Sequence, residues 1–259
     1  MTTTKTDAPN RAHAVHPRPL FGKTLLVTGA ARRLGRAIAL AAAENGADVA
    51  ITYRKSEREA RAVVGELARL GAEALAVRCD VTDETSVREM VKEVGGVLGG
   101  IDVLVNNAAN YESVEFEKLT VAQWDAIFAT NARAPFLVSR EALPHLRTRR
   151  GRIVHMGSLG GLRPWASNAH YCSSKAAVHM LTKVMAKALA PEIAVNAVAP
   201  GMIDLGDKAA AAFLKRMAKQ TPMRRNGTAA DIAAAVMFFA TAPSFITGQV
   251  LAVDGGIGL

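Results

Sequence analysis

The chain has 259 residues, of which half are hydrophobic and 5% aromatic, and its formal net charge is +9 at pH 7. This length suits one large α/β domain with a sizeable core, and the longest apolar runs fall well short of the ~20 residues that a membrane helix needs. Two cysteines, Cys79 and Cys172, offer neither a disulfide framework nor metal-ligand spacing. We therefore expect no membrane partner, no metal and a cytoplasmic location.

The positive charge is scattered along the chain, and the sequence contains no recognisable nucleic-acid-binding module. This distribution favours a solvated surface with a pocket for an anionic cofactor, and we expect no nucleic-acid partner. Residues 1–20 are polar and lack the apolar segment of a secretion signal. We expect them to form a disordered arm ahead of a single domain at 21–259.

The first patterned stretch joins a short apolar strand at 24–27 to a glycine-containing turn and a helix at 36–44. This order suits a pyrophosphate, because glycine lets the backbone approach closely and a helix N-terminus offers free N–H groups. The turn residues Gly29 and Leu34 are therefore expected to lie against a dinucleotide.

A second strand, expected at 48–53, ends without an Asp or Glu, the residue type that holds the ribose hydroxyls of NAD. Cations stand there instead, and two more lie in the first turn. We expect four cations to converge on the 2′-phosphate of NADPH, since each can form a charge-assisted bond. The alternative is a solvated loop ahead of a charged helix at 57–69. The residues expected at this phosphate are Arg32, Arg33, Tyr53, Arg54, Lys55 and Ser56.

A third strand is expected at 73–79, and it closes on Asp80 and Val81. The Asp80 carboxylate can accept a hydrogen bond from an adenine amino group. It can also cap the helix expected near 83–98, and the two roles are compatible.

Asn107 and Ala108 follow a fourth strand at 102–105, where amides and small side chains let a backbone pass beside a ribose. Farther along, a helical region contains Asn131 four residues before Pro135. Proline has no N–H to donate, so we expect a kink or an opened turn at this point. The opening either exposes polar groups to the site or is only a bend.

An apolar strand expected at 151–157 ends at Ser158. If the next helix begins near Tyr171, the side chains of Tyr171 and Lys175 lie one turn apart on the same face. An ammonium beside a phenol favours the phenolate, so Tyr171 can exchange a proton nearer neutral pH, while the Ser158 hydroxyl bonds a substrate oxygen. Taken alone, a Tyr four residues before a Lys is equally compatible with an ordinary helix.

Strands and helices alternate through the rest of the chain. A further strand is expected at 193–198, ahead of Pro200 and Gly201, and a last one at 249–253. The segment 204–220 is either a mobile helical lid over a substrate or a surface helix. We therefore predict an α/β fold of one domain, with a doubly wound, seven-stranded parallel sheet and helices on both faces.

Six motifs stand in an order that resembles the short-chain dehydrogenase/reductase family, and the resemblance runs from about residue 21 to residue 259. They are Thr28-Gly29 with Gly35, Asn106-Asn107-Ala108, Asn131, Ser158, Tyr171 with Lys175, and Pro200-Gly201. The resemblance implies a Rossmann fold, NADPH as the hydride donor and a carbonyl substrate. Within the family, the chain looks like the pteridine reductase and 3-oxoacyl-acyl-carrier-protein reductase branches.

The resemblance also implies individual roles. Tyr171 would be the general acid/base, Lys175 would lower its pKa and hold the nicotinamide ribose, and Ser158 would polarise the carbonyl. Asn131 would keep a water that links Lys175 to solvent. The implied cofactor contacts are Asp80 and Val81 to adenine, Asn107 to the adjoining ribose, and Ile203 to the nicotinamide carboxamide, after Pro200 and Gly201.

Three positions depart from the family pattern. Arg33 replaces the middle glycine of the first turn, as in pteridine reductases, Ala109 replaces a glycine, and Leu205 replaces a threonine that contacts the cofactor. Ser158 stands where parasite pteridine reductases carry Asp, and reductases of 3-oxoacyl thioesters keep this serine. The substrate stays open between a 3-oxoacyl thioester or similar ketone and a pteridine or dihydrofolate.

A non-catalytic NADPH-binding regulator is the remaining alternative, although an intact set of Ser, Tyr, Lys and Asn argues against it. The resemblance further implies a homotetramer built through the long helices and the C-terminal edge. The expected walls of the substrate pocket are Tyr111, Trp165, Met202 and the segment 204–220.

Overall fold

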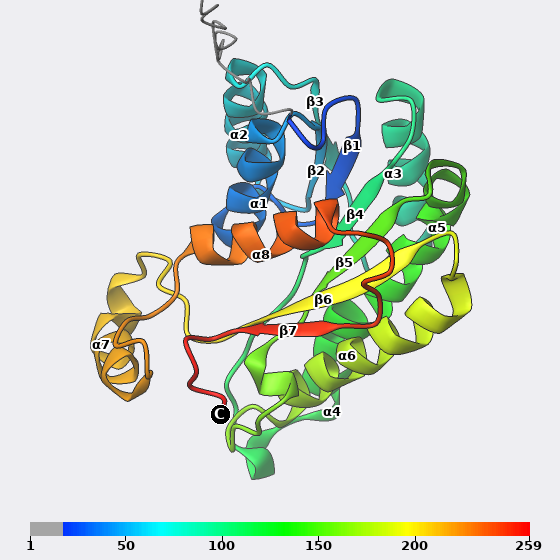
Figure 1. Ribbon diagram of the computed structural model, residues 1–259. Helices are drawn as coiled ribbons and strands as arrows, with labels where there is room; N and C mark the ends of the chain where they lie inside the picture. Colours follow the sequence, from blue (N-terminus) through cyan, green and yellow to red (C-terminus); the bar gives the residue numbers. More distant parts are fainter. Residues whose placement is uncertain (1–17) are drawn as a thin grey trace, which may run out of the picture.

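Seven parallel strands form the centre of the computed structural model, which describes residues 18–259 (Figure 1). Their order across the sheet is β3-β2-β1-β4-β5-β6-β7. The strands are β1 Thr24–Val27, β2 Asp48–Tyr53, β3 Ala74–Arg78, β4 Val103–Asn106, β5 Arg152–Met156, β6 Ala194–Pro200 and β7 Val250–Val253. The predicted doubly wound α/β fold of one domain is confirmed.

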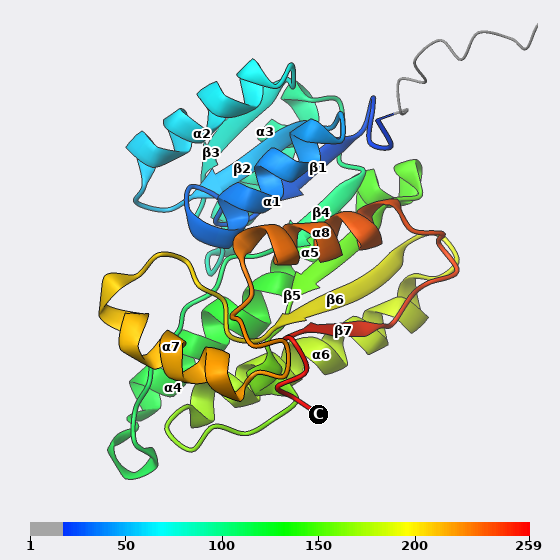
Figure 2. The same ribbon diagram turned by 60° about the vertical axis from the view of Figure 1, so that its left-hand side comes forward.

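Helices cover both faces of this sheet (Figure 2). One face carries α1 Arg33–Glu44, α2 Glu57–Arg69 and α8 Ala229–Thr241. The other face carries α3 Glu84–Val97, α4 Val121–Phe128, α5 Ala134–Arg149 and α6 Ala169–Leu189. Within residues 18–259 no helix combines the length and the apolar character needed to cross a membrane.

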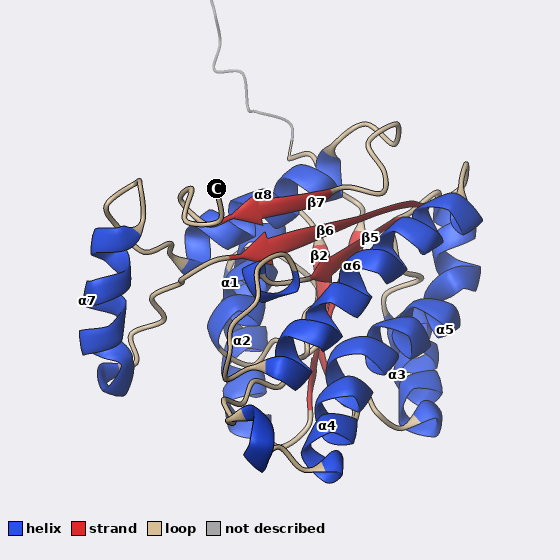
Figure 3. Cartoon of the chain, turned by 90° about the horizontal axis from the view of Figure 1, so that it is seen from below, coloured by secondary structure: helices blue, strands red, loops and turns tan. Residues whose placement is uncertain are grey.

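The helix α7, Ala211–Gln220, stands apart from both layers, beyond the arrowheads of β6 and β7 (Figure 3). A short helix, Lys208–Ala210, leads into it. A parallel bridge between Ile203 and Gly227 closes the base of the segment that carries α7. The segment is therefore a helical excursion anchored at both of its ends.

The strands bury both of their faces, which is what a parallel sheet between two helical layers requires. Leu25 of β1 lies in one buried cluster with Ile38 of α1. Leu26, the next residue, lies in the other buried cluster with Met90 of α3. Successive side chains of a strand point to opposite faces, so one short apolar run serves both layers.

The start of the domain differs from its expected boundary. Residues 1–17 of the expected arm lie outside the described part of the chain. Leu20, which we also assigned to the arm, is 3% exposed and packs in the cluster that contains α1. Its N–H donates to the Asn45 carbonyl oxygen at the end of α1, at 3.0 Å. Leu20 therefore belongs to the domain, because its apolar side chain is buried and its backbone is bonded to the helix end.

The chain reverses its direction of winding between β1 and β4. The strand β1 pairs with β2 on one side and with β4 on the other. Successive strands therefore depart in opposite directions from this point, and the loops after β1 and β4 separate at the carboxyl edge of the sheet. Ligands of such folds bind in the crevice that results.

Gly35 lets α1 approach that crevice closely. A Cβ atom at this position would lie 2.6 Å from the Ala30 Cα, 2.6 Å from the Asn107 Nδ2 and 2.7 Å from the Gly29 carbonyl oxygen. These neighbours are backbone atoms of the turn and a bonded amide, so they cannot move away independently. Any side chain here would push α1 away from the loops after β1 and β4.

We predict that Gly35→Ala lowers the free energy of unfolding by about 1–3 kcal/mol, the usual cost of overpacking. Gly65→Ala in α2 is the matched control, because a Cβ there would meet nothing within 4 Å. The control should gain about 0.5–1 kcal/mol from its better helix propensity. Urea unfolding of the three proteins measures both effects, and equal stabilities of the two variants would contradict the close approach.

Candidate active site

Two adjoining cavities open at the carboxyl edge of the sheet. The first, of about 500 Å³, lies among the turn after β1 and the ends of β2, β3 and β4. The second, of about 760 Å³, lies between the ends of β5 and β6 and the segment that carries α7. Arg33, Leu34, Tyr111, Tyr171 and Leu205 line both cavities, so the two are neighbours that share one wall.

Most of the residues predicted for the site line one of these cavities. Those at the first are Gly29, Arg32, Arg33, Leu34, Tyr53, Arg54, Ser56, Asp80, Val81, Asn107, Ala108 and Tyr171. Those at the second are Arg33, Leu34, Asn107, Ser158, Tyr171, Lys175, Pro200, Gly201 and Ile203. Among the predicted residues in the described chain, Lys55 and Asn131 line neither cavity.

Hydroxyl groups hold the glycine turn after β1 in place. The N–H of Gly29, whose φ is 63°, donates to the Thr52 Oγ1 at 3.0 Å. The Thr28 Oγ1 accepts from the N–H groups of Asn107 and Ala108, both at 3.0 Å. The Asn107 Nδ2 donates back to the carbonyl oxygens of Thr28 and Gly29. These bonds join the loops after β1 and β4, and they use the amide donor of Asn107 within the protein.

Neither Thr28 nor Thr52 was predicted to shape the site, although both are almost fully buried. Each is a hydroxyl residue at the carboxyl end of an apolar strand. A buried hydroxyl needs a partner, and the nearby turn offers unpaired N–H groups. A hydroxyl residue at the end of an apolar strand, combined with a glycine turn, is therefore a sequence pattern that could have predicted these bonds.

Arg33 occupies the position where the family resemblance led us to expect glycine. Its φ is 54°, in the left-handed region that costs a non-glycine residue about 1–2 kcal/mol. Its guanidinium Nη2 lies 3.7 Å from the Asp207 Oδ2, and both side chains are at least half exposed. Arg33 therefore extends from the turn after β1 to the base of the α7 segment, across the wall that the two cavities share.

Three of the four expected cations line the first cavity, and the place of Lys55 at the cofactor phosphate stays a prediction. Arg32 donates to the Ser56 hydroxyl, and both residues line the first cavity with Arg54. Lys55 lines a neighbouring depression with Arg54, Arg78 and Asp80. Arg54 and Asp80 line both hollows, so the depression adjoins the first cavity.

Asp80 lies in the first cavity and does not cap α3. Its Oδ1 accepts from the N–H and the hydroxyl of Thr82, at 3.0 and 2.7 Å. The hydroxyl bond is the largest cause that lowers the pKa of Asp80, and Arg54 adds to it. The helix cap is Asp83, whose Oδ1 accepts from the Ser86 N–H at 2.7 Å. Asp80 is therefore held as a carboxylate acceptor beside Val81.

Ser158, Tyr171 and Lys175 meet at the second cavity. Ser158 follows β5, and its Oγ accepts from the Gly160 N–H at 3.0 Å. Tyr171 and Lys175 lie one turn apart near the start of α6, as expected. The Lys175 Nζ is buried and donates to the Met156 carbonyl oxygen at the end of β5, at 2.8 Å.

Burial dominates the proton affinities of this group. It raises the pKa of Tyr171, and a hydrogen bond with Ser158 acts in the opposite direction. Burial lowers the pKa of Lys175 to about 8. The Lys175 Nζ lies 5.9 Å from the centroid of the Tyr171 ring and is bonded to Met156, and the expectation that Lys175 lowers the pKa of Tyr171 stays a prediction.

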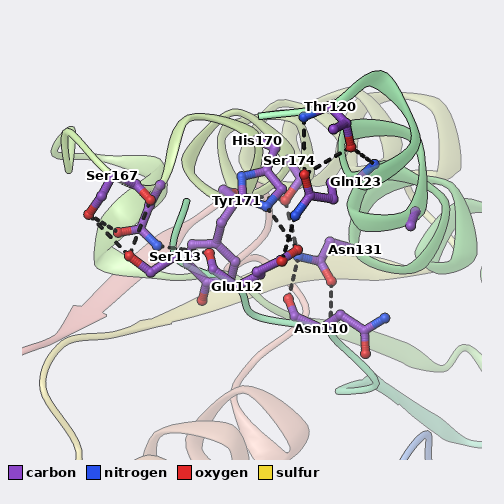
Figure 4. A network of polar contacts seen from close by, with 12 residues as sticks. Asn110, Glu112, Ser113, Thr120, Gln123, Asn131, Ser167, His170, Tyr171 and Ser174 are labelled. Carbon is purple, nitrogen blue, oxygen red and sulfur yellow. Dashed lines mark hydrogen bonds and ion pairs between the residues drawn. The ribbon is translucent and has the colours of Figure 1, made fainter. Parts of the chain in front are cut away.

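Asn131 supports the site from behind. The opened turn expected before Pro135 is confirmed as a π-helix at Ala129–Arg133, where Pro135 has no N–H for the Asn131 carbonyl. The Asn131 side chain accepts from the Asn110 N–H at 2.8 Å and donates to the Asn110 carbonyl and to the Ser174 hydroxyl (Figure 4). This amide therefore holds the backbone beside Tyr111. The expected water link between Asn131 and Lys175 stays a prediction.

The second cavity thus gathers a neutral phenol, a hydroxyl and a titratable amine. Such a set can donate a proton and a hydrogen bond to one oxygen that develops negative charge. Among residues 18–259 no group of three His, Cys, Asp or Glu side chains is placed to hold a metal ion. The first cavity offers arginines, a carboxylate and a glycine turn, which suit a nucleotide.

Comparisons with known proteins agree with this geometry. A family model described as enoyl-(acyl carrier protein) reductase matches residues 29–258. The chain is 40% identical over 240 residues to the 3-oxoacyl-[acyl-carrier-protein] reductase FabG of Staphylococcus aureus, and the match covers 91% of this chain and 98% of that protein.

Solved structures agree as well. A short-chain dehydrogenase/reductase from Serratia marcescens superposes with a TM-score of 0.88 and 35% identity, over 93% of this chain and all of that one. A blue fluorescent protein from a metagenomic library, solved in complex with NADPH, has a TM-score of 0.88 and 34% identity over the same shares.

Burial of the Lys175 ammonium has a measurable effect on stability. The folded pKa, about 8, lies below the ordinary value of 10.5, so between these values the unfolded chain binds more protons than the folded chain. The stability of the wild type should therefore rise, relative to Lys175→Met, as pH increases through this window. From pH 7.5 to 9.5 we expect a relative gain on the order of 2 kcal/mol.

Urea unfolding at the two pH values measures this gain. The lost bond to Met156 is the same at both pH values and drops out of the difference. Lys183→Met, the same substitution on the exposed face of α6, reports what the exchange of side chains does by itself. The gain in stability between the two pH values should be larger for the wild type relative to Lys175→Met than relative to Lys183→Met. Equal gains would show that burial of the Lys175 ammonium carries no cost.

Proposed function

The chain belongs to the short-chain dehydrogenase/reductase family and is an oxidoreductase, and we propose that it transfers hydride from NADPH to the carbonyl carbon of a small-molecule substrate. One observation carries the proposal. Tyr171 and Lys175 on α6 and Ser158 after β5 line a single cavity, which adjoins the cavity of the glycine turn.

Tyr171 donates the proton in this proposal. NADPH, when bound, supplies the hydride to the carbonyl carbon, and the electron pair of the C=O bond moves to the oxygen. Burial raises the pKa of Tyr171, so its phenol is protonated at neutral pH and can give its proton to that oxygen. The Ser158 hydroxyl stabilises the developing charge by a hydrogen bond.

Lys175 restores the proton. Its pKa of about 8 lies close to neutral pH, so the amine can take up and release a proton at low cost during turnover. Its bond to the Met156 carbonyl fixes the amine between β5 and the Tyr171 ring. Asn131 acts through other groups, because it positions the Asn110 backbone and the Ser174 hydroxyl of α6.

The cofactor preference rests on charge. The strand β2 ends without an acidic residue, and Arg32, Arg33, Arg54 and Ser56 line the first cavity there. Guanidinium groups suit the 2′-phosphate that distinguishes NADPH from NADH. The solved relative in complex with NADPH supports this choice.

We assign the other cofactor contacts by position in the two cavities. Gly29 and Leu34 would lie against the pyrophosphate, next to the N-terminus of α1. The first cavity would hold the adenosine half against Tyr53, Asp80, Val81, Asn107 and Ala108. The second would hold the nicotinamide against Tyr171, Lys175, Pro200, Gly201 and Ile203.

Similarity to 3-oxoacyl-[acyl-carrier-protein] reductases supports a 3-oxoacyl thioester or a similar ketone as the substrate. Pteridine or dihydrofolate reduction is the in-family alternative, and Arg33 is the residue that favours it. A non-catalytic NADPH-binding regulator is the alternative from another class. The complete set of Ser158, Tyr171 and Lys175 in one cavity favours an enzyme.

We also propose that the chain forms a homotetramer and works in the cytoplasm. Large apolar side chains are exposed on the outer helices, among them Phe136 of α5 and Met180 and Val184 of α6. Exposed apolar surface of this kind is typical of interfaces between subunits. The two cysteines, Cys79 and Cys172, are free thiols, which suits a reducing compartment.

Tyr171→Phe tests the proposed reaction. We expect the rate of NADPH oxidation to fall by about 10²–10⁴-fold, since the proton donor is lost. The affinity for NADPH should change little. Initial rates are measured with dihydrobiopterin, an acetoacetyl thioester, an α-diketone and a quinone.

The panel separates the alternatives. Turnover of dihydrobiopterin alone would indicate that the protein is a pteridine reductase. No turnover of any compound, with tight NADPH binding and salt-dependent binding of random DNA, would select the regulator.

Arg33→Gly combined with Arg54→Ala tests the cofactor preference. Each lost charge-assisted bond costs about 1.5–3 kcal/mol, so the Kd for NADPH should rise at least tenfold per arginine while that for NADH changes little. Lys55→Ala is the matched control, because Lys55 lines the neighbouring depression. Titration of both nucleotides measures the effect, and equal losses for NADPH and NADH would remove the assignment.

A further inference from the structure

Two aromatic rings flank the Tyr171 ring at the second cavity. Tyr111 meets it edge-on, with ring centroids 4.9 Å apart and an interplanar angle of 83°. Trp165 lies nearly parallel to it, with centroids 6.3 Å apart and an angle of 9°. Both rings line the cavity, so a molecule whose carbonyl reaches Tyr171 must lie beside them.

Trp165 also lies near the Ser158 hydroxyl, which is the group proposed to bond the substrate oxygen. A Cβ atom placed on Gly160 would be 3.2 Å from the Trp165 Cζ3 and 3.4 Å from the Ser158 Oγ. The indole and the hydroxyl therefore border one small region. The part of a substrate that adjoins its reacting carbonyl would contact the indole first.

Hydrogen bonds join the two segments that carry these aromatic residues. The Val114 N–H donates to the Ser167 carbonyl at 2.8 Å, and the Ser113 hydroxyl lies 3.1 Å from the Ser167 hydroxyl (Figure 4). The buried Asn168 amide donates to the Glu112 carbonyl at 3.0 Å. These bonds join the segment of Tyr111 to the loop of Trp165, so the backbone that carries the two rings loses little conformational entropy when a substrate ring binds.

The part of the lining that α7 contributes is apolar. Phe213, Leu214 and Met217 of α7 form it, and Met202 joins them from the end of β6. These residues offer no polar group beyond their backbone. With a volume of about 760 Å³, the cavity has room for a fused two-ring molecule beside the nicotinamide.

Charge in this cavity is already paired. Among the described residues that line it, the ionisable groups other than Tyr111 and Tyr171 are Arg33, Asp207 and Lys175. Arg33 and Asp207 face each other at 3.7 Å, and Lys175 is bonded to the Met156 carbonyl. Because Arg33 is also assigned above to the NADPH 2′-phosphate, a carboxylate or a phosphate on the substrate would find no free cation in this cavity.

We infer that the substrate of this site is an uncharged ketone that carries an aromatic ring next to its reacting carbonyl, with the ring held against Trp165 and Tyr111. This inference rests on the carbonyl reduction proposed above. Aromatic pairs contribute about 0.5–1.5 kcal/mol beyond buried area, or about 2- to 13-fold in affinity for each ring.

A matched pair of ketones tests the inference. In 2-tetralone and 2-decalone the skeleton is the same and the carbonyl is not conjugated, so they differ in the presence of an aromatic ring. We expect kcat/KM with NADPH to be at least about tenfold higher for 2-tetralone. Acetoacetyl-coenzyme A, which carries several negative charges, should be a poorer substrate than the uncharged acetoacetyl thioester of N-acetylcysteamine.

Trp165→Leu should lower the ratio of kcat/KM for 2-tetralone to that for 2-decalone about tenfold. Trp165→Phe should restore most of the preference. Trp124→Leu is the control, since Trp124 lies on α4 and does not line the cavity. In a Trp124→Phe protein, Trp165 is the remaining tryptophan, and 2-tetralone with NADP⁺ should quench its fluorescence.

Equal kcat/KM for the two ketones, or equal losses for both in Trp165→Leu, would overturn the inference, as would unquenched fluorescence at saturating 2-tetralone. Turnover of 2-decalone or of the thioester that Tyr171→Phe abolishes would still leave the proposed reaction standing. Absence of any turnover that depends on Tyr171 would instead remove the proposed function itself.

Discussion

The buried ammonium of Lys175 connects the parts on which this site depends. An ammonium that is taken out of water must find an acceptor, and the Met156 carbonyl at the end of β5 provides one. This bond ties the start of α6 to the strand that precedes Ser158. It thereby sets Tyr171 beside the serine, and it holds the amine at a pKa of about 8. The packing of the sheet on both faces stabilises the fold and offsets the free-energy cost of burying this charge.

The two cavities are built in different ways. The first depends on the backbone, because buried hydroxyls of Thr28 and Thr52 shape the glycine turn and Gly35 lets α1 come close. The second depends on side chains from segments that are tied to one another across the site. Arg33 connects the two, since it begins in the turn and reaches Asp207 at the base of the α7 segment. Its left-handed backbone is a local strain that the turn sustains at a position where function is expected.

Sequence reasoning succeeded where a signal is local. The apolar runs at 24–27 and 48–53 and the charged helix at 57–69 have the bounds expected from their patterns. The opened turn before Pro135 followed from the missing N–H of one residue. Sequence reasoning failed where the contacting residues lie far apart in the chain. Nothing near Leu20 in the sequence shows that its side chain is covered.

The sequence by itself determined the order of strands and helices, the doubly wound sheet and the shared face of Tyr171 and Lys175, because hydrophobic period and chain order dictate them. The tertiary structure alone decided three things. It placed Lys55 in a depression beside the first cavity, directed the Asn131 amide to the Asn110 backbone, and raised the pKa of Tyr171 by burial. Each of these depends on contacts between segments far apart in the chain, and neither composition nor spacing contains such distances.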